Sequence, residues 1–568
     1  MMRSIIRNPV RMRSIIRNHI MMRSIIFDTK KVRYLLHLKF IVVCTIAACT
    51  RPQPLQNSGV DDLTPTLAES MPRDPVAQAL ESLRGLYNPW DLSPVSLPFD
   101  GLGNWQDAEI AHVRPGQDTL ATRMSILDFA QKSVRLQTFI MKGDETGQAF
   151  ANKLIELVAR GVDVQLLVDD ANIPFKGAQN LFLYLTSHGV KVHGYRPVWM
   201  QLGNNANWIT RVVNGGGGTG SNGAGQLIDF ADRKNHRYHE KIMVVDAEIP
   251  GRGTVMMGGT NIANEYYNIQ VKRDELLWRD QDIVVRGDGI VGDMARAFDA
   301  NLADITEFNK NSSFSDAVEG AVSNARGVFG SGRAIGLDLD AGAMQRVAAA
   351  SSRVAQLQWS RANVRMIHHS PLKKEFRVEQ RLLAAIASAR REVILVNPYF
   401  IPSKEMMAAL IASARRGVRV QILTNSILAG DSPAVQEVGR MFYKNLMFET
   451  SAARGGPQSV PIEIHEWGGD PEFKNGYGTL HAKYAVFDRQ LAHVGSFNLD
   501  PRSQVFNNEV VVETDDRLLV ARLVEQYTRD SGPGFASLVT PQETAGYNAG
   551  TDLEKLRRKV LTMFKVFL

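Results

Sequence analysis

The chain has 568 residues, of which 44% are hydrophobic and 22% charged, as in ordinary globular proteins. It has only two cysteines, Cys44 and Cys49, both near the N-terminus. The composition therefore excludes a thiol nucleophile, an internal disulfide and a cysteine metal site from the folded body. The net charge of +7 suits an anionic partner, such as lipid headgroups or nucleic acid, although a surplus of this size on a large chain is also common without a functional meaning.

Residues 1–49 are predicted to be a targeting segment. Basic residues precede a short apolar run at 40–48, which is too short to span a bilayer but suits the core of a signal peptide. Ile46-Ala-Ala-Cys49 resembles the bacterial lipobox and predicts lipidation of Cys49; the alternative is an uncleaved anchor. Because Met-Arg-Ser-Ile-Ile occurs three times before this run, we expect the true start of translation to lie at Met21 or later.

Residues 50–95 are rich in Pro, Ser, Asp and Asn and are predicted to be a tether. Regular structure is predicted from about Gly116, with helices at 120–132 and 147–159 and strands at 134–140 and 164–168. The same order is predicted for helices at 380–389 and 404–414 and strands at 393–396 and 420–423. A Gly-rich run at 214–225 predicts a mobile loop, and residues 310–352 are expected to connect the halves.

The repeated alternation of strand and helix predicts an α/β fold with a mixed, largely parallel sheet in each half. The first domain is placed at 96–350. The second is placed at 351–568.

A polar pattern occurs once in each half. The first copy has His239, Lys241 and Asp246, followed by a Gly-rich turn that ends in Asn261. The second copy has His481, Lys483 and Asp488, each 242 positions after its counterpart, and its turn contains Ser496 and Asn498. Each motif lies on a predicted strand, where alternate side chains share a face, so the histidine and lysine of each copy point the same way.

Two imidazoles and two ammonium groups brought together from two halves form a site for an oxyanion, and phosphate is the obvious candidate. Two matches at one offset make chance implausible. The histidine, lysine and aspartate of each copy are taken as the catalytic motif. The aspartates lie five residues past the lysines, so we expect Asp246 and Asp488 to brace the fold without touching the phosphate.

These residues identify a resemblance to the phospholipase D superfamily and, within it, to bacterial cardiolipin synthases of the C type. Gly495-Ser-Phe-Asn-Leu-Asp-Pro-Arg-Ser503, Asn397-Pro-Tyr-Phe400 and Leu423-Thr-Asn-Ser426 carry it further. The sequence departs from that subfamily in the longer turn from Asp246 to Gly258 and at Ala300-Asn-Leu302. The resemblance implies two phospholipase D-like α/β/α sandwich domains related by a pseudo-two-fold axis.

It also implies a mechanism. His239 would attack phosphorus to form a phosphohistidine, and His481 would act as general acid and then as base, so the two need opposite protonation. Lys241, Lys483, Asn261, Ser496 and Asn498 would hold the phosphate oxygens. Asp280 and Glu509 would orient the histidines; the alternative is that they are surface acids. No metal or other cofactor is expected, because the ammonium groups supply the positive charge.

Three activities share such a site: synthesis of cardiolipin, hydrolysis of phospholipid to phosphatidic acid, and cleavage of nucleic acid. The lipobox favours lipid, because it places the chain on a membrane. Residues 553–567 are predicted to form a basic amphipathic helix that suits an anionic interface, or else packs on the second domain. The expected substrates are phosphatidylglycerol and, as a further candidate, phosphatidylethanolamine; nucleic acid is not expected. The predicted location is the periplasmic side of a bacterial cell membrane or outer membrane.

Overall fold

The computed structural model describes residues 104–169, 177–195, 236–271, 276–310, 334, 337–471 and 478–547. The targeting segment with Cys49, the tether, the Gly-rich run and the predicted C-terminal helix lie outside these residues.

The first half contains, in chain order, β1 (Gln106–Val113), α4 (Gln117–Asp128), β2 (Ser133–Thr138), α5 (Glu145–Ala159), β3 (Asp163–Asp169), α6 (Ala178–Ser187), β4 (Lys191–Tyr195), β5 (Arg237–Tyr238), β6 (Ile242–Val245), β7 (Thr254–Gly258), η2 (Asn264–Tyr267), β8 (Leu277–Arg279), β9 (Asp282–Arg286), α9 (Asp288–Lys310) and α11 (Ala341–Ser351).

The second half contains β10 (Trp359–His369), η3 (Pro371–Lys373), α12 (Arg377–Ser388), β11 (Glu392–Val396), α13 (Lys404–Arg415), β12 (Arg419–Asn425), α14 (Pro433–Glu449), β13 (Glu463–Trp467), β14 (Gly478–Leu480), β15 (Tyr484–Phe487), β16 (Leu491–Gly495), α15 (Pro501–Val505), β17 (Asn507–Thr514), α16 (Arg517–Asp530), β18 (Ala536–Leu538) and α17 (Pro541–Tyr547).

The predicted helices and strands before each motif are present, with ends that local chemistry explains. Helix α5 begins where the Asp144 side chain accepts the backbone N–H of Gly147, and α13 begins where Ser403 accepts that of Met406. The chain leaves α5 at Gly161, which has a φ of +83°, a conformation that glycine adopts without strain. The prediction that regular structure starts near Gly116 is wrong, because β1 begins at Gln106.

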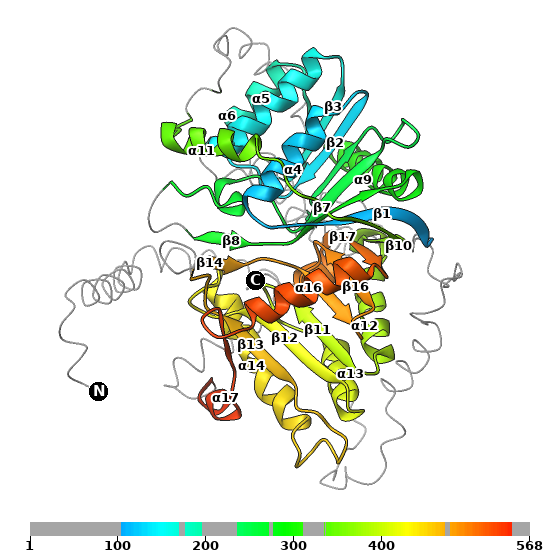
Figure 1. Ribbon diagram of the computed structural model, residues 1–568, viewed down its shortest axis with the longest axis vertical. Coiled ribbons are helices and arrows are strands. Elements are labelled where there is room, and N and C mark those ends of the chain that lie inside the picture. The colour runs from blue at the N-terminus through cyan, green and yellow to red at the C-terminus, as the bar shows by residue number, and fades with distance from the viewer. Residues whose placement is uncertain are drawn as a thin grey trace, which may run out of the picture. The chain divides into compact units, whose positions relative to one another are not determined.

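One sheet runs through both halves. Its strand order is β18-β13-β12-β11-β15-β16-β17-β10-β1-β9-β7-β6-β2-β3-β4. Outward from the antiparallel pair β1–β10, the order β1-β9-β7-β6-β2-β3-β4 matches β10-β17-β16-β15-β11-β12-β13. The two halves are therefore related by a pseudo-two-fold axis, as expected, and Figure 1 shows them as the blue-to-green and yellow-to-red parts of the ribbon.

The sheet is mixed, as expected, but most of its strand pairs are antiparallel, which corrects the expectation that parallel pairing predominates. Parallel pairing holds for β2-β3-β4 and for β11-β12-β13, where a helix connects successive strands. The motif strands β6 and β15 run antiparallel to β2 and β11 and return into β7 and β16 through the connections at 246–253 and 488–490. Connections as short as these can join only antiparallel neighbours, and each of them begins at the aspartate of its motif.

Helices cover both faces of the sheet, and one hydrophobic core crosses between the halves. Helices α4, α5 and α6 cover one face of the first half, and α12 and α13 cover the matching face of the second. Helix α9 of the first half also packs on β10, and α16 of the second half also packs on β1. The core under α9 and α16 includes Phe298, Val364 and Leu523, which come from both halves.

Two short strand pairs cross between the halves. β5, just before the first motif, pairs with β17, and β14, just before the second motif, pairs with β8. Figure 1 shows β8 and β14 running side by side at the junction of the halves. The segment just before each motif histidine therefore pairs with a strand of the other half, which places both motifs at the interface between the halves.

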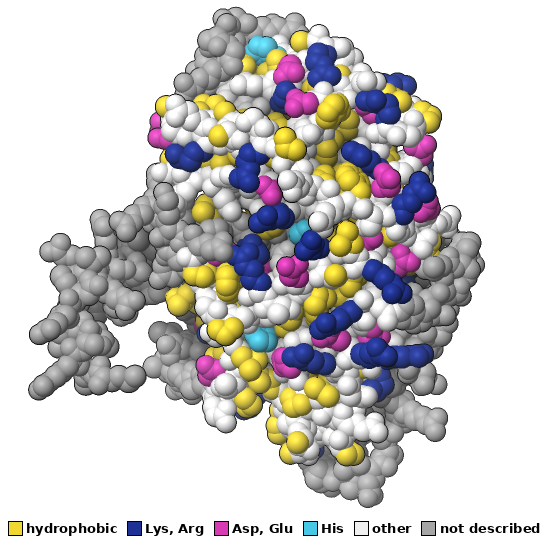
Figure 2. All heavy atoms as spheres, viewed as in Figure 1, with side chains coloured by type: hydrophobic (Ala, Val, Ile, Leu, Met, Phe, Trp, Pro, Cys, Tyr) yellow, Lys and Arg dark blue, Asp and Glu magenta, His cyan; other side chains and the backbone are white. Residues whose placement is uncertain are grey.

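Among the described residues, no helix combines the length and apolar character needed to cross a bilayer. Figure 2 shows basic side chains spread among acidic and apolar ones over one face, without a single basic patch. Several described arginines pair with carboxylates, as Arg135 does with Glu248 and Arg419 with Glu463.

Candidate active site

The backbone of each motif histidine is held by the opposite half. The His239 N–H donates to the carbonyl of Asn508 at 3.0 Å, and the His481 N–H donates to that of Arg279 at 2.7 Å. Asn508 directly precedes Glu509 in the sequence, and Arg279 directly precedes Asp280. Each hydrogen bond therefore also brings a predicted orienting acid to the histidine.

The side chains follow the same crossed arrangement. His239 Nδ1 lies 2.9 and 3.0 Å from the two carboxylate oxygens of Glu509, and His481 Nδ1 lies 2.6 Å from Asp280 Oδ2. All four residues are buried. A carboxylate on Nδ1 fixes the tautomer that carries its proton there and leaves Nε2 unprotonated, as a nucleophile or base requires. The surface alternative for these two acids does not match their burial.

Glu509 is itself fixed by two hydroxyl groups. Ser496 Oγ donates to Glu509 Oε2 at 2.5 Å, and Ser503 Oγ donates to Oε1 at 2.6 Å. A hydroxyl has one proton to donate, so Ser496 cannot at the same time donate to a phosphate oxygen. This corrects the expected role of Ser496, which supports the acid that holds His239.

The two lysines repeat one arrangement. Lys241 Nζ donates to the His239 carbonyl and Lys483 Nζ to the His481 carbonyl, each at 2.5 Å. Burial lowers the pKa of Lys241 to about 7 and that of Lys483 to about 8, although Glu509 and Asp280 oppose the shift. Burial therefore disfavours the charged forms of both lysines, and an anion bound between them would offset that free-energy cost.

Burial favours the neutral form of both motif histidines. Burial lowers the pKa of His239 to about 4, a shift that Glu509 opposes and Lys241 strengthens. Burial also lowers the pKa of His481 well below its usual value, and the positive charges of Lys483 and Lys241 and the nearby His239 add to this. Burial shifts the pKa of both histidines in the same direction, so it does not by itself produce the opposite protonation expected for the pair.

The two asparagines differ. Asn261 Oδ1 accepts the backbone N–H of Ile140 at 2.9 Å and its Nδ2 donates to the Tyr266 hydroxyl at 2.7 Å, so it ties its turn to neighbouring segments. Asn498 is buried, and its Oδ1 has no hydrogen-bond partner among the described residues. Of the two, Asn498 is the better placed to meet a substrate.

Two segments of the chain match a sequence family described as cardiolipin synthase, phospholipase D-like domain: residues 124–213 and 382–531. The second segment contains His481, Lys483 and Glu509. The structure supplies the first motif, which lies between the segments, in the same crossed arrangement. The chain belongs to the phospholipase D superfamily.

Similar proteins agree with this assignment. Cardiolipin synthase C of Escherichia coli (strain K12) is 26% identical over 431 residues, which cover 72% of this chain and 81% of that protein. The minor cardiolipin synthase ClsB of Bacillus subtilis (strain 168) is 24% identical over 75% of this chain and 81% of its own length. The fold resembles the crystal structure of phosphatidylserine synthase from Haemophilus influenzae Rd KW20, with a TM-score of 0.54 and 13% identity over 87% of this chain and 100% of that one.

In this phospholipase D fold, the motif aspartates lie at the far end of β6 and β15 from the histidines. The Asp246 carboxylate accepts the backbone N–H groups of Gln131, Lys132 and Ser133. Asp488 does the same for Arg390, Arg391 and Glu392. Both aspartates therefore close the turn between a helix and the next strand, which confirms that they brace the fold; within the catalytic motif their role is structural.

We expect Asp488→Ala to lower the free energy of unfolding by about 2–3 kcal/mol, because three backbone N–H groups lose their acceptor. Asp488 also has a φ of +51°, a conformation that alanine adopts less readily. Urea unfolding followed by circular dichroism would measure the loss. Asp163→Ala, at an exposed position of β3, is the matched control; an equal change in both variants would contradict the bracing role.

Aromatic side chains that the sequence analysis did not single out surround the imidazoles. The ring of Phe139 lies 4.8 Å from that of His239, and the rings of Trp278 and Tyr266 lie 4.7 and 5.5 Å from that of His481. Trp278 and Tyr266 come from the first half, like Asp280. Of the three, Trp278 alone stands beside an acid in the sequence, in Trp278-Arg-Asp280, and this is the signal that could have identified it.

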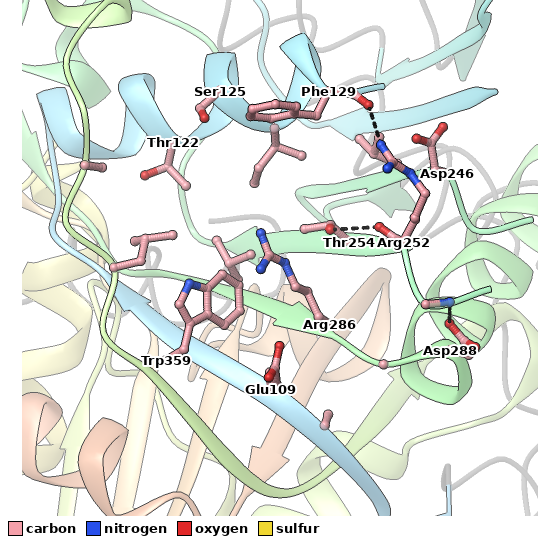
Figure 3. Close-up of a pocket in the computed structure, with 18 of the residues that line it drawn as sticks. Glu109, Thr122, Ser125, Phe129, Asp246, Arg252, Thr254, Arg286, Asp288 and Trp359 are labelled. Atoms are coloured by element: carbon pink, nitrogen blue, oxygen red, sulfur yellow. Dashed lines mark hydrogen bonds between the residues drawn. The ribbon is translucent and has the colours of Figure 1, made fainter. Parts of the chain in front are cut away.

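A separate hollow lies away from the motif histidines. It has a volume of about 790 Å³ and lies around the Asp246 end of β6. Figure 3 shows Arg286 beside Trp359, with the guanidinium carbon 4.1 Å from the ring centre, and Phe129 and Arg252 on the other side. None of the four histidines and lysines of the motifs lines it. Among the described residues, no group of His, Cys, Asp and Glu side chains is arranged to hold a metal ion.

Proposed function

We propose that this chain is a phosphatidyltransferase that makes cardiolipin from phospholipids through a phosphohistidine intermediate. The crossed arrangement of His239 with Glu509 and His481 with Asp280 is the observation that carries the proposal. It gives two oriented imidazoles and two buried ammonium groups at one interface, which is what phosphoryl transfer without a metal needs. The similarity to cardiolipin synthases over most of the chain supports a lipid substrate.

In the first step, His239 Nε2 attacks the phosphorus of a phospholipid such as phosphatidylglycerol. The bond from phosphorus to the headgroup oxygen breaks, and that oxygen takes a proton from His481. In the second step, the hydroxyl of an acceptor lipid gives its proton to His481 and attacks phosphorus, which breaks the phosphorus–nitrogen bond. The charges of Lys241 and Lys483 stabilise the phosphate oxygens in both steps.

His481 must be protonated before the first step, although burial and the nearby lysine charges lower its pKa. A bound phosphodiester brings a negative charge next to it and offsets the two lysine charges that lower its pKa. Substrate binding therefore raises the pKa of His481. As a result, His481 takes up its proton only when a leaving group is present to receive it.

Two other activities remain alternatives. With water as the acceptor, the same steps make phosphatidic acid, and with a nucleic acid as the donor they cut a phosphodiester bond. We favour lipid because a lipidated Cys49 and a tether at 50–95 would hold domains at 96–350 and 351–568 against a periplasmic membrane surface. Loss of membrane sedimentation in a Cys49→Ser variant would test this anchor.

Purified full-length chain in phosphatidylglycerol vesicles should make cardiolipin and free glycerol in equal amounts, measured by lipid mass spectrometry. Phosphatidic acid as the sole lipid product would instead identify a phospholipase. Cleavage of DNA or RNA without any lipid turnover would contradict the lipid substrate.

We expect kcat/KM to decrease as pH rises above about 7–8. A lysine is charged only below its pKa, and burial brings those of Lys241 and Lys483 to about 7 and 8 in the free enzyme. Because kcat/KM reports the groups of the free enzyme, the loss should appear there and should be weaker in kcat, where bound phosphate keeps the lysines charged. A flat kcat/KM from pH 6 to pH 9 would contradict the role given to the lysines.

A further inference from the structure

A tyrosine–aspartate pair lies beside the candidate site and is not used by the mechanism above. The hydroxyl of Tyr399 donates to Asp431 Oδ2 at 2.8 Å. Tyr399 belongs to the segment after β11, and Asp431 belongs to the loop between β12 and α14. The pair therefore joins two loops of the second half.

Strand register places both loops next to the second motif. Val396, the last residue of β11, pairs with Tyr484, so the segment that leads to Tyr399 leaves the sheet beside Lys483. Asn425, at the end of β12, donates to the carbonyl of Leu480 at 2.8 Å and accepts its N–H at 2.9 Å. The loop from Ser426 to Asp431 therefore begins next to the residue that precedes His481.

Hydrogen bonds fix both loops. Asn397 Oδ1 accepts the backbone N–H of Tyr399 and also that of Leu499 in the turn after the second motif. In the other loop, the Thr479 hydroxyl donates to the carbonyl of Ala429 at 2.8 Å. A pair held on two fixed loops is suited to position a ligand, because little conformational freedom is lost on binding.

The electrostatic setting favours a hydroxyl group over an amine as that ligand. The pair offers a phenol that donates and a carboxylate that accepts, and an alcohol can both accept and donate, whereas an ammonium group can only donate. The charge of Lys483 is close enough to affect the Asp431 carboxyl and would repel a second cation. Asp431 is also reached by solvent, so a headgroup can approach it.

The corresponding position of the first half carries no phenol. The pair Gln137–Ile242 is the counterpart of Val396–Tyr484, so the position of Tyr399 corresponds to Ile140, which is apolar. The pseudo-two-fold symmetry is therefore broken by a polar group on the side of His481. In the proposed mechanism this is the side on which the headgroup alcohol leaves and the acceptor alcohol enters.

We propose that Tyr399 and Asp431 bind the glycerol headgroup of phosphatidylglycerol through its hydroxyl groups and so select a polyhydric alcohol as acceptor. This inference rests on the proposed phosphatidyltransferase function and names its acceptor subsite. On binding, a glycerol hydroxyl replaces Asp431 as the acceptor of the Tyr399 proton and itself donates to Asp431, and a second hydroxyl of the same headgroup is presented to His481. A headgroup held in this way occupies the position that water would need for hydrolysis.

The test is a competition between two acceptors in one reaction. Phosphatidylglycerol vesicles are the donor, and deuterated glycerol and 1-propanol, which has the same carbon chain with a single hydroxyl, are present together. Mass spectrometry gives the ratio of deuterated phosphatidylglycerol to phosphatidylpropanol. We expect the unmodified chain to prefer glycerol, and Tyr399→Phe and Asp431→Asn each to reduce that preference about tenfold, the effect of one lost hydrogen bond of about 1.4 kcal/mol. Asp431→Asn should also lower the ratio of cardiolipin to phosphatidic acid.

The ratio does not depend on how much of each variant folds. Tyr184→Phe in α6 and Asp128→Asn at the end of α4 are matched controls outside the site, and both should keep the preference of the unmodified chain. An unchanged glycerol preference in Tyr399→Phe and Asp431→Asn would overturn the subsite. Absence of any lipid product from the unmodified chain would instead overturn the proposed function itself.

Discussion

Alanine in place of either His239 or His481 is expected to reduce cardiolipin formation by at least about 10⁴-fold. The loss of His239 removes the nucleophile, and the loss of His481 removes the proton from the leaving alcohol and the base for the acceptor. Because every turnover needs both imidazoles, the double variant should be no slower than the slower single variant. Initial rates with phosphatidylglycerol vesicles would measure all three.

His188→Ala is the matched control, because His188 lies at the end of α6 and bonds only within its own segment among the described residues. It should keep nearly full activity. Losses that multiply in the double variant, or an active His239→Ala, would show that the two histidines do not act as one unit.

The second large effect is expected at the acids. Glu509→Gln and Asp280→Asn should each lower kcat by about 10²–10⁴-fold, since an amide cannot stabilise the imidazolium and can favour the wrong tautomer. Glu509 should be the more sensitive to its surroundings, because Ser496 and Ser503 both donate to its carboxylate and cannot donate equally well to an amide nitrogen.

Steady-state kinetics and thermal unfolding of the same preparations would separate catalysis from stability. Glu463→Gln, on the exposed edge of β13 where Glu463 pairs with Arg419, is the control and should be nearly silent. A loss confined to the melting temperature, with kcat unchanged, would contradict the orienting role of both acids.

Much of this site can be predicted from the sequence because its polar motif occurs twice. The repeated histidine, lysine and glycine-rich turn identify the two motif strands, and period-two alternation places each histidine and lysine on one face. The acids could be named because the resemblance to the superfamily implies an orienting acid after each motif, at Asp280 and Glu509. The sequence does not reveal that each acid serves the histidine of the other half, since that depends on the strand pairs β5–β17 and β8–β14, which are two or three residues long.

The misassigned residues have physical explanations. β1 carries polar residues at Gln106, Asp107 and Glu109, so it does not stand out as a strand, yet it pairs on both sides and joins the halves. Strand direction was misjudged because helix–strand alternation covers only the first strands of each half. Ser496 was expected at the phosphate because its turn follows the motif, but its single proton is committed to Glu509. The lowered pKa values of both histidines result from burial and from the nearby lysine charges, which come together only in the folded chain.

The central claim is that one site built across both halves transfers a phosphatidyl group through His239. Its most direct test is the His481→Ala variant with a lipid phosphodiester whose leaving group is p-nitrophenol, labelled in the phosphate. Such a leaving group needs no general acid, so the first step should proceed, while the second step lacks its base. We predict a burst of one nitrophenolate per chain and a label on His239, found by peptide mass spectrometry after an alkaline quench. A label on another residue, or steady turnover without any labelled protein, would contradict the account.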